Sequence, residues 1–449
     1  MYALPPLFVE QMKEQLGAEA EAFFRSYEEP RQSALRLNRL KLPEGHPMRK
    51  TLAALFGLRP VPWCEDGYFY ADSVRPGKHP FHYAGLYYIQ EPSAMRAAEV
   101  LDPQPGEVVL DLAAAPGGKT TQIAAKMRGQ GLLVANEILP DRAKVLSENV
   151  ERLGIANALV LQASPAQLSA AFAGKFDRVL LDAPCSGEGM FRKDPDIIPQ
   201  WTPRAVRFCA ARQRDILPHA AALLKPGGKL VYSTCTFNTL ENEENIRWFL
   251  EAHPDFELLK EERLWPHRGE GEGHYIALLA KKASAGETAY TAFRSKPLSR
   301  PEAGAMQAFE AFAAQDLPGF RLPEGGQPLL FGESLFWLPR EIERLGGAKS
   351  LRGLRVLRPG LQLGDVRARG RFEPHHALAM AASADDARLV VPLSPEGPEV
   401  AAYLRGETLP APADARGWGI AAVAGFPLGW VKASGGLYKN HRPKGLRVL

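Results

Sequence analysis

The chain has 449 residues, of which 45% are hydrophobic and 24% charged, a globular composition that excludes a disordered chain. At about 150 residues per domain, this length favours roughly three domains. No apolar run approaches the about 18 residues that span a bilayer, and the N-terminus lacks the positive start and apolar centre of a signal peptide. We therefore expect a cytoplasmic protein with no membrane partner.

The four cysteines are too sparse for a disulfide framework, and none has the spacing of a zinc site. They are Cys64, Cys185, Cys209 and Cys235. We expect no metal. The net charge of +4 predicts no partner by itself, but residues 415–449 contain six Lys or Arg and no Asp or Glu. A second basic stretch, 352–371, contains six arginines opposed only by Asp365. Such stretches attract polyanions.

The N-terminal part, residues 1–85, is predicted to be a small α+β unit. Apolar residues from Leu7 to Tyr27 recur near helical spacing, and the run closes at Glu29-Pro30. An alternating segment from Ser33 to Leu40 then indicates a strand.

Residues 86–282 alternate short apolar runs with helical patterns, which predicts an α/β domain with a parallel sheet. The predicted strands are Val108–Leu112, Leu132–Asn136, Ala158–Leu161, Asp177–Asp182, Lys229–Ser233, Phe256–Leu259 and Tyr275–Ala280. The intervening helices begin near Lys119, Pro140, Pro165 and Pro203.

A polar, proline-punctuated linker is predicted over 283–300. Beyond it, a helix over Ala303–Ala314 precedes short apolar runs broken by glycine and proline. Region 301–449 is therefore expected to be β-rich, possibly as two small units.

The loop after the first strand of the α/β domain indicates a nucleoside site. The chain reads Asp111-Leu-Ala-Ala-Ala-Pro-Gly-Gly-Lys-Thr120, and small residues there let backbone approach a ligand. Glu137 ends the next strand, 20 residues after Gly117, where a carboxylate can accept from both ribose hydroxyls. Neither G-x-G-x-x-G nor the phosphate-binding loop is present, so an adenosine without pyrophosphate, S-adenosylmethionine, is favoured. The alternative is a tight turn followed by a solvated glutamate.

Cys185 and Cys235 both follow strands, and Asp182 lies three residues before the first. A buried cysteine is usually a small hydrophobe, but two at neighbouring strand ends beside an aspartate favour chemistry. Cytosine C5 becomes nucleophilic once a thiolate adds to C6 while an acid stabilises the ring at N3, and cysteine, with a pKa of about 8.5 that its site can lower, supplies that thiolate. A second cysteine can assist release.

Three runs resemble the RNA cytosine-C5 methyltransferases, and within them the bacterial 16S ribosomal RNA enzymes of the RsmF type. They are Asp111–Thr120, Asp182-Ala-Pro-Cys-Ser-Gly-Glu-Gly189 and Tyr232-Ser-Thr-Cys-Thr236. The resemblance extends over nearly the whole chain. It implies a Rossmann-like S-adenosylmethionine-dependent core with a mostly parallel seven-stranded sheet, an N-terminal RNA-binding unit and a PUA-like C-terminal RNA-binding region.

The resemblance also implies roles. Cys235, after threonine, would attack C6, whereas Cys185, after proline, would assist release. DNA enzymes use a Pro-Cys nucleophile, so matching Pro184-Cys185 alone would reverse these roles. Asp182 would contact the cytosine edge and Lys119 would lie near the reacting groups. The implied cofactor-binding set is Ala113, Ala114, Ala115, Pro116, Gly117, Gly118, Lys119, Glu137, Arg142, Ser164 and Asp182. Ser164 departs from the family, which often has an acidic residue there.

The leading hypothesis is an enzyme that forms 5-methylcytosine in 16S ribosomal RNA, with ribosomal RNA or the small ribosomal subunit as partner and a monomer as the favoured state. Transfer RNA is the alternative substrate. A noncatalytic ribosome assembly factor is disfavoured because Asp182, Cys185 and Cys235 are all present. A nicotinamide dehydrogenase is disfavoured because the dinucleotide motif is missing.

Overall fold

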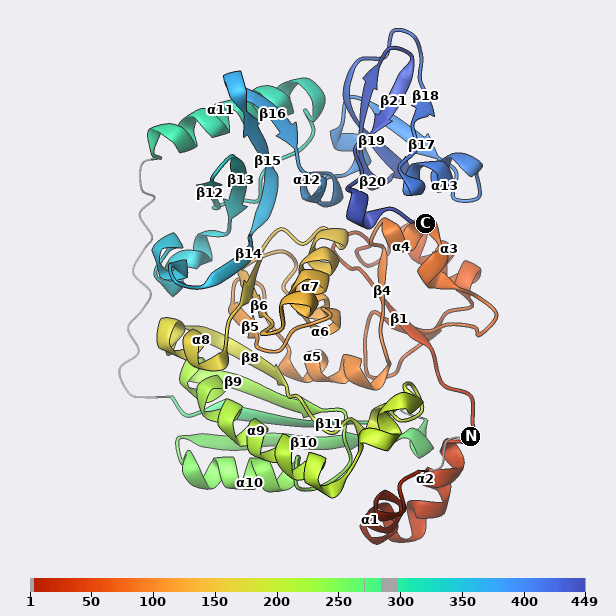
Figure 1. Ribbon diagram of the computed structural model, residues 1–449, viewed down its shortest axis with the longest axis vertical. Coiled ribbons are helices and arrows are strands. Elements are labelled where there is room, and N and C mark those ends of the chain that lie inside the picture. Colours follow the sequence, from red (N-terminus) through yellow and green to blue (C-terminus); the bar gives the residue numbers. More distant parts are fainter. Residues whose placement is uncertain (1–3, 270, 284–297, 449) are drawn as a thin grey trace.

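The computed structural model describes residues 4–269, 271–283 and 298–448. Most of the predicted linker, residues 284–297, lies outside the described residues. The described chain forms one sheet in its N-terminal part, a large central sheet and two sheets in its C-terminal part (Figure 1).

The N-terminal segment predicted as one helical run forms two helices, α1 (Pro6–Leu16) and α2 (Ala20–Ser26). They are separated by a 3₁₀ turn that begins at Gly17, whose φ of +53° ends the first helix. Their apolar residues, such as Phe8 and Phe23, pack on Phe191 and Phe237 of the central part. These helices therefore lie apart from the N-terminal sheet, at the bottom of Figure 1.

The N-terminal sheet has the order β2-β3-β1-β4, with every neighbouring pair antiparallel. Its strands are β1 (Ala34–Leu37), β2 (Arg59–Pro60), β3 (Gly67–Phe69) and β4 (Tyr87–Ile89), and it is accompanied by α3 (Pro47–Phe56) and α4 (Pro80–Tyr83).

The central sheet has eight strands in the order β10-β11-β9-β8-β5-β6-β7-β14. The strands are β5 (Val108–Asp111), β6 (Leu132–Asn136), β7 (Ala158–Gln162), β8 (Phe176–Asp182), β9 (Leu224–Thr234), β10 (Phe256–Leu264), β11 (His274–Lys281) and β14 (Arg355–Pro359). The five strands from β9 to β7 are parallel to one another, and the outer strands are antiparallel to their neighbours. The predicted α/β fold with a mostly parallel sheet is confirmed.

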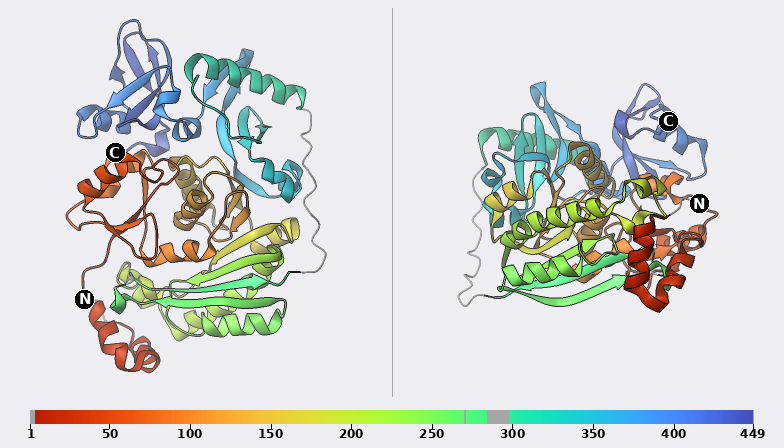
Figure 2. Two further views of the ribbon diagram at one scale, coloured as in Figure 1. Left: turned by 180° about the vertical axis from the view of Figure 1, so that it is seen from behind. Right: turned by 60° about the horizontal axis from the view of Figure 1, so that its bottom comes forward.

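Helices cover both faces of this sheet because successive strand residues point to opposite faces. Along β5, Val108 and Leu110 belong to the core shared with α8 (Pro165–Phe172), α9 (Pro203–Leu223) and α10 (Glu243–Ala252). Val109 belongs to the opposite core, shared with α5 (Arg96–Leu101), α6 (Gly118–Lys126) and α7 (Pro140–Arg152). Figure 2 shows these two helical layers from behind and from below.

The eighth strand was not predicted, because it comes from the C-terminal region. β14 adds antiparallel to β7, with Arg355 opposite Gln162 and Pro359 opposite Leu159. A short apolar run carries no information about its pairing partner, whereas the folded domain leaves the edge of β7 open for a ladder.

The first C-terminal sheet has the order β12-β13-β15-β16. Its strands are β12 (Gln327–Phe331), β13 (Ser334–Leu338), β15 (Leu361–Arg367) and β16 (Arg371–Pro374), and α11 (Arg300–Asp316) and α12 (His376–Ala381) flank it. The expectation that only Asp365 opposes the arginines of 352–371 is wrong, because the sheet also brings in Glu333 and Glu373. Arg367 Nη1 lies 2.5 Å from Glu333 Oε2 and its Nε 3.0 Å from Glu373 Oε2.

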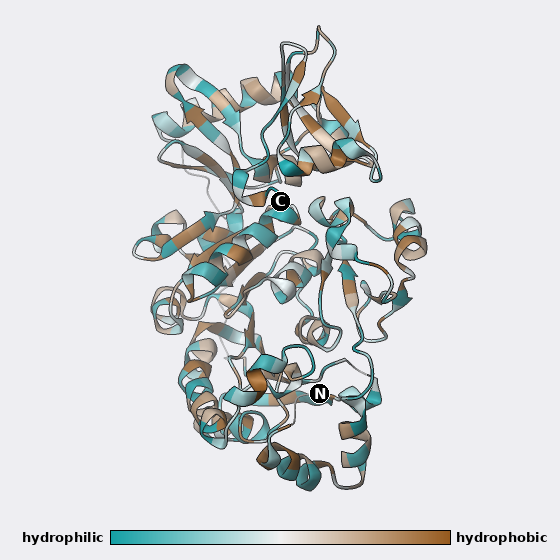
Figure 3. Cartoon of the chain, turned by 45° about the vertical axis from the view of Figure 1, so that its right-hand side comes forward, coloured by the Kyte–Doolittle hydropathy of each residue, from teal (hydrophilic) through white to brown (hydrophobic). Residues whose placement is uncertain are grey.

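The last sheet has the order β17-β19-β20-β21-β18. It comprises β17 (Val390–Leu393), β18 (Leu409–Pro410), β19 (Gly417–Val423), β20 (Phe426–Ser434) and β21 (Leu437–Asn440), with α13 (Pro398–Arg405) beside it. Hydrophobic residues mark its strands at the top of Figure 3. They share a core with the N-terminal sheet, so the C-terminus lies next to α3 and α4 (Figures 1 and 2).

Within the described ranges, no helix combines the length and apolar character that a membrane span requires.

A buried ion pair fastens β14 to α7. Arg358 Nη2 pairs with Glu151 Oε2, and both side chains are less than a tenth exposed. Burial opposes ionisation of Glu151, but Arg358 outweighs it and holds the pKa of the carboxyl below its ordinary value.

We expect Arg358→Met to lower the free energy of unfolding by about 3–5 kcal/mol, because Glu151 would stay buried without its closest cation. Urea unfolding followed by tryptophan fluorescence measures this change. Arg352→Met is the matched control, since Arg352 is exposed. Equal stability of the two variants would contradict a structural role for the pair.

Candidate active site

The loop of small residues after β5 turns the chain into α6. Gly117 has a φ of +113°, in the left-handed region, where other L residues are strained. A Cβ there would also lie 3.2 Å from Leu146 Cδ1. The predicted loop therefore has both the conformation and the close packing that favour glycine.

Asp111, at the end of β5, is a buried carboxyl with one unsatisfied oxygen. Thr120 Oγ1 donates to its Oδ2 at 2.6 Å, whereas Oδ1 has no hydrogen-bond partner in the described part of the chain. Burial raises the pKa of Asp111 to about 7, although the Thr120 hydrogen bond opposes the shift. A cationic ligand group in this loop would stabilise the ionised form.

Asn136 ties the ends of three strands together, a role that sequence analysis missed. Its Nδ2 donates to Leu112 O at 3.1 Å and to Ala163 O at 3.0 Å, and its Oδ1 accepts from Ala163 N at 3.0 Å. Its carbonyl also accepts from Ala114 N at 2.8 Å. An asparagine closing an apolar strand directly before Glu137 was the available signal.

Glu137 lies after β6 with its side chain only 4% exposed. Its Oε1 accepts from Leu139 N at 3.0 Å, and its Oε2 lies 3.8 Å from Arg142 Nη1. Arg142 Nη2 donates to Ala115 O at 2.7 Å, so this arginine joins the acidic residue to the loop of small residues.

Ser164 begins α8 rather than pointing freely toward a ligand. Its hydroxyl accepts from Gln167 N at 3.3 Å, and Gln167 Oε1 accepts from Ser164 N at 2.9 Å, a reciprocal capping box. The capping bond therefore already engages the hydroxyl of Ser164, a member of the implied cofactor-binding set.

A cavity of about 170 Å³ connects the loop to Lys119 and Asp182. The N-terminal sheet supplies part of its wall through Tyr88, Ile89 and Gln90, residues that the sequence did not assign to the site.

Buried Arg36 of β1 joins the N-terminal sheet to this site. It donates to Gly118 O at 3.2 Å, to Thr121 Oγ1 at 2.7 Å and to Gln90 Oε1 at 3.3 Å. Burial lowers the pKa of this guanidinium. The arginine positions the start of α6 against the N-terminal unit.

Asp182 accepts hydrogen bonds on both oxygens. Lys119 Nζ donates to Oδ2 at 2.7 Å and Ser233 Oγ donates to Oδ1 at 2.8 Å, while His274 Nε2 lies 3.5 Å from Oδ1. Burial opposes ionisation of Asp182, but Lys119 and His274 hold the pKa of its carboxyl well below the ordinary value. Burial alone would lower the pKa of Lys119, yet Asp182 raises it. The pair is therefore ionic.

The structure places Cys185 and Cys235, the two cysteines predicted to carry the chemistry, next to each other. Cys185 Sγ lies 3.4 Å from Cys235 Sγ, and both side chains are half-buried. The hydrogen bond with Cys235, followed by burial, raises the pKa of Cys185 well above the ordinary value. Cys185 therefore keeps its proton and can donate it toward Cys235.

Two buried glutamates hold the cysteine loops against each other. Glu188 Oε2 accepts from Phe237 N at 2.7 Å and from Asn238 N at 2.9 Å. Glu241 Oε2 accepts from Ser186 N at 3.0 Å and from Gln213 Nε2 at 2.8 Å. Each carboxylate thus joins the segment after one cysteine to the segment after the other.

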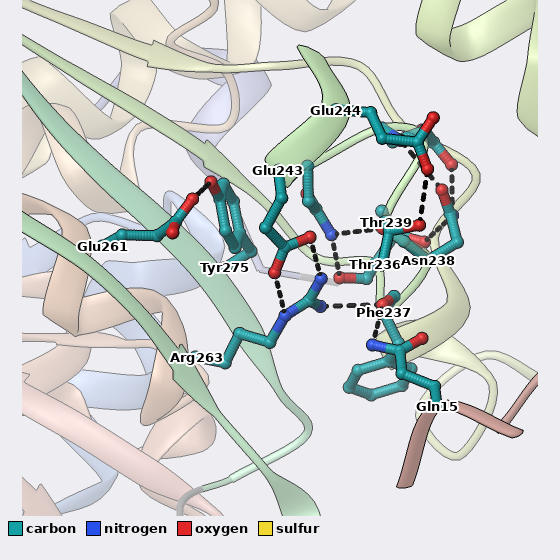
Figure 4. A network of polar contacts seen from close by, with 12 residues as sticks. Gln15, Thr236, Phe237, Asn238, Thr239, Glu243, Glu244, Glu261, Arg263 and Tyr275 are labelled. Carbon is teal, nitrogen blue, oxygen red and sulfur yellow. Dashed lines mark hydrogen bonds and ion pairs between the residues drawn. The ribbon is translucent and has the colours of Figure 1, made fainter. Parts of the chain in front are cut away.

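A third set of contacts anchors the Cys235 loop from outside (Figure 4). Phe237 O accepts from Gln15 Nε2 of α1 at 2.9 Å and from Arg263 Nη1 of β10 at 2.8 Å. Arg263 also donates to Glu243 Oε1 at 2.8 Å. The N-terminal helices therefore support a loop that lies more than 200 residues later in the chain.

Among the residues that the structure describes, no three His, Cys, Asp or Glu side chains cluster in a way that could hold a metal ion.

Family comparisons cover most of the chain. The family described as 16S rRNA methyltransferase RsmB/F matches residues 98–280, and the N-terminal domain of 16S rRNA methyltransferase RsmF matches 4–92. The RsmF rRNA methyltransferase first C-terminal domain matches 311–381, and the methyltransferase RsmF PUA domain matches 391–448.

Curated relatives match over almost their whole length. Ribosomal RNA small subunit methyltransferase F of Shewanella amazonensis is 36% identical over 445 residues, covering 93% of this chain and 92% of the relative. The protein of that name from an Enterobacter species is 33% identical over 469 residues, covering 98% and 95%.

Solved structures resemble part of this chain. A methyltransferase homolog protein from Pyrococcus horikoshii has a TM-score of 0.56 at 32% identity, covering 61% of this chain and 94% of that one. NSun6 from the same organism has a TM-score of 0.56 at 22% identity, covering 62% and 99%, and shares the fold.

The fold and the site define a Rossmann-like methyltransferase with an appended PUA domain. With relatives above 30% identity along nearly the full length, the chain belongs to the RsmF family of 16S rRNA methyltransferases. The resemblance inferred from the sequence motifs is confirmed.

Close packing around Gly189 yields a stability prediction. A Cβ at this residue would lie 3.0 Å from Cys235 O and 3.0 Å from Glu272 O, both backbone atoms. We expect Gly189→Ala to destabilise the fold by about 1–3 kcal/mol through overpacking. At Gly304, in α11, an added Cβ meets nothing within 4 Å, so Gly304→Ala should stabilise by about 0.5–1 kcal/mol. Urea unfolding measures both changes. An unchanged free energy of unfolding in Gly189→Ala would contradict the prediction, because it would show that the Cys235 loop moves to accommodate the added Cβ at no cost.

Proposed function

We propose that the protein transfers a methyl group from S-adenosylmethionine to C5 of a cytosine in 16S ribosomal RNA. The observation that carries this proposal is the pair of thiols 3.4 Å apart, next to the strand end where Lys119 pairs with Asp182. Such a pair suits a reaction that forms and then breaks a bond between enzyme and base.

The loop residues fit S-adenosylmethionine. Ala113–Gly118 would lie against it, Glu137 would accept from its ribose hydroxyls and Arg142 would hold the loop. The unpartnered Oδ1 of Asp111 is a suitable neighbour for the positive charge of this cofactor. Ser164, whose hydroxyl caps α8, would contribute less than the loop residues, because the capping bond already engages its hydroxyl. When bound, the cofactor supplies an electrophilic methyl group.

The two cysteines would divide the work. Because its pKa is raised, Cys185 keeps its proton and can stabilise a thiolate on Cys235 by donating a hydrogen bond. The Cys235 thiolate would add to C6 and increase the electron density at C5. After C5 has taken the methyl group, solvent water would accept the C5 proton. The electron pair of that C–H bond would restore the C5–C6 double bond and expel Cys235 as a thiolate. Cys185 would assist this release.

Asp182 would recognise the base. Since Lys119 and His274 hold it as a carboxylate, it would accept a hydrogen bond from the exocyclic amino group of cytosine. Lys119, whose charge is preserved by this pairing, would remain beside the reacting groups as a cation and favour the negative charge that develops on the base.

The RNA would be held mainly by other parts of the chain. Residues 415–448 contain no Asp or Glu. Within them Lys439 and Lys444 are exposed, whereas Arg442 is buried and donates to Leu428 O at 2.9 Å. Lysines of this kind bind phosphates without reading sequence. We propose that the protein acts as a monomer in the cytoplasm, on ribosomal RNA or the small ribosomal subunit, with transfer RNA as the alternative substrate.

The cysteine assignment predicts distinct outcomes for three variants. We expect Cys235→Ala to reduce methyl transfer on the order of 10³-fold or more, and Cys185→Ala to accumulate a denaturant-resistant protein–RNA adduct. Cys209→Ala, on α9, is the matched control and should transfer normally. The assay uses labelled S-adenosylmethionine with 16S ribosomal RNA and with small subunits.

The reverse pattern, an adduct with Cys235→Ala, would make Cys185 the nucleophile. No transfer by the wild type to either substrate would favour transfer RNA or a noncatalytic role.

The raised pKa of Asp111 leads to the prediction that protons are released when the cofactor binds. Its pKa of about 7 leaves it about half protonated at neutral pH, and a bound cation lowers the pKa of a carboxyl. We therefore expect release of about half a proton per S-adenosylmethionine at pH 7. Calorimetry in two buffers of different ionisation enthalpy measures it. Release should vanish with Asp111→Asn and persist with Asp141→Asn, which changes an exposed residue. Unchanged release in Asp111→Asn would contradict this role.

A further inference from the structure

A second cavity of about 540 Å³ lies in the N-terminal unit. Its wall comes from the segment before β1, the loop between β3 and α4, and the end of β4. The side chains relevant to its chemistry are Arg31, Tyr70, Asp72, Arg75, Lys78 and Ile89.

This cavity adjoins the catalytic cavity. Ile89, at the end of β4, lines both of them. Arg31 Nη1, from the second cavity, donates to the carbonyl of Lys193 at 3.3 Å, and Lys193 lines the catalytic cavity. A chain-like ligand in the catalytic cavity could therefore continue into the second one.

The charge of the second cavity suits a phosphate. Three exposed cations, Arg31, Arg75 and Lys78, stand against one acid, Asp72. Arg75 Nη1 is bound to Asp72 O at 2.5 Å and to Val74 O at 2.9 Å, which holds the guanidinium beside the loop and leaves its other nitrogens for a ligand.

The cavity also offers surface for a base. Tyr70 is half-buried, so its ring is fixed while part of it remains accessible. Opposite the loop, Ile89 is 36% exposed, and a Cβ on Gly77 would lie 3.2 Å from its Cδ1. An aromatic ring with apolar neighbours beside cations is the combination that binds single-stranded nucleic acid.

We propose that this second cavity binds the nucleotide adjacent to the target cytosine, with Tyr70 against its base and Arg31, Arg75 and Lys78 around its phosphates. The inference rests on the proposed function for its substrate class, single-stranded RNA. It assigns to the N-terminal unit the task of holding the strand beside a base that has left its stack.

Binding is measured separately from methyl transfer. The probe is a fluorescein-labelled nine-nucleotide RNA with one central cytidine among uridines, titrated by anisotropy at several salt concentrations. For Arg31→Ala/Lys78→Ala we expect about 10- to 30-fold weaker binding at 0.1 M salt and a salt slope smaller by about 1.4, from two lost phosphate contacts. Lys50→Ala, an exposed lysine on α3, is the matched control.

Tyr70→Leu keeps an apolar side chain but removes the ring. We expect about tenfold weaker binding with an unchanged salt slope, because stacking carries no charge. In methyl transfer to 16S ribosomal RNA, both variants should raise KM for RNA and leave kcat and the KM for S-adenosylmethionine unchanged.

The outcomes separate the two proposals. Wild-type affinity and slope in both variants, with normal transfer by the wild type, would overturn the subsite and leave the proposed function intact. Weakened binding by the variants, with no transfer by the wild type to any ribosomal substrate, would support the subsite and overturn the function. A wild-type protein that does not bind the probe would overturn the subsite.

Discussion

The parallel pairing of β8 with β9 is the constraint on which the site depends. Leu181 lies opposite Tyr232, and Asp182 lies opposite Ser233, so both strands end at one level. The loops that follow must then leave the sheet side by side, which brings Cys185 and Cys235 within 3.4 Å although 50 residues separate them in sequence. Ser233 Oγ donates to Asp182 at this point, so the carboxylate that is proposed to recognise the base is tied to the strand that precedes the proposed nucleophile.

The short distance between the thiols of Cys185 and Cys235 is maintained only if the loops that carry them are rigid. Glu188 and Glu241 are fully buried, and burying a carboxylate is unfavourable unless hydrogen bonds compensate for the lost water. Here Phe237 N, Asn238 N and Ser186 N donate to them. A displaced loop would leave a buried charge without donors, and this cost keeps the loops in place.

The N-terminal and C-terminal regions contact the central domain through side chains and strand pairing, and not only through the chain connections. Arg36 connects the N-terminal sheet to α6, and β14 completes the edge of the central sheet. Leu37 of the N-terminal sheet shares a core with Val431 of the PUA domain. The proposed RNA-binding surfaces therefore have a defined position relative to the cavity beside Lys119 and Asp182. Such a fixed arrangement is needed if one RNA strand is to bind to several regions at once.

The sequence determined what depends on neighbours along the chain. The period of apolar residues predicted the strands and helices of the central domain, and motifs around Gly117, Cys185 and Cys235 identified the family, because turns and strand ends are encoded locally. Tertiary structure decided what depends on contacts between distant segments. These contacts are the pairing of β14 with β7, the cavity wall formed by Tyr88 and Gln90, and the packing of α1 on the Cys235 loop. They also include the ion pairs of Arg358 with Glu151 and of Arg367 with Glu333, which make these two arginines less available to RNA. Strand pairing, burial and ion pairing act through space, and a single sequence does not specify which distant residues become neighbours.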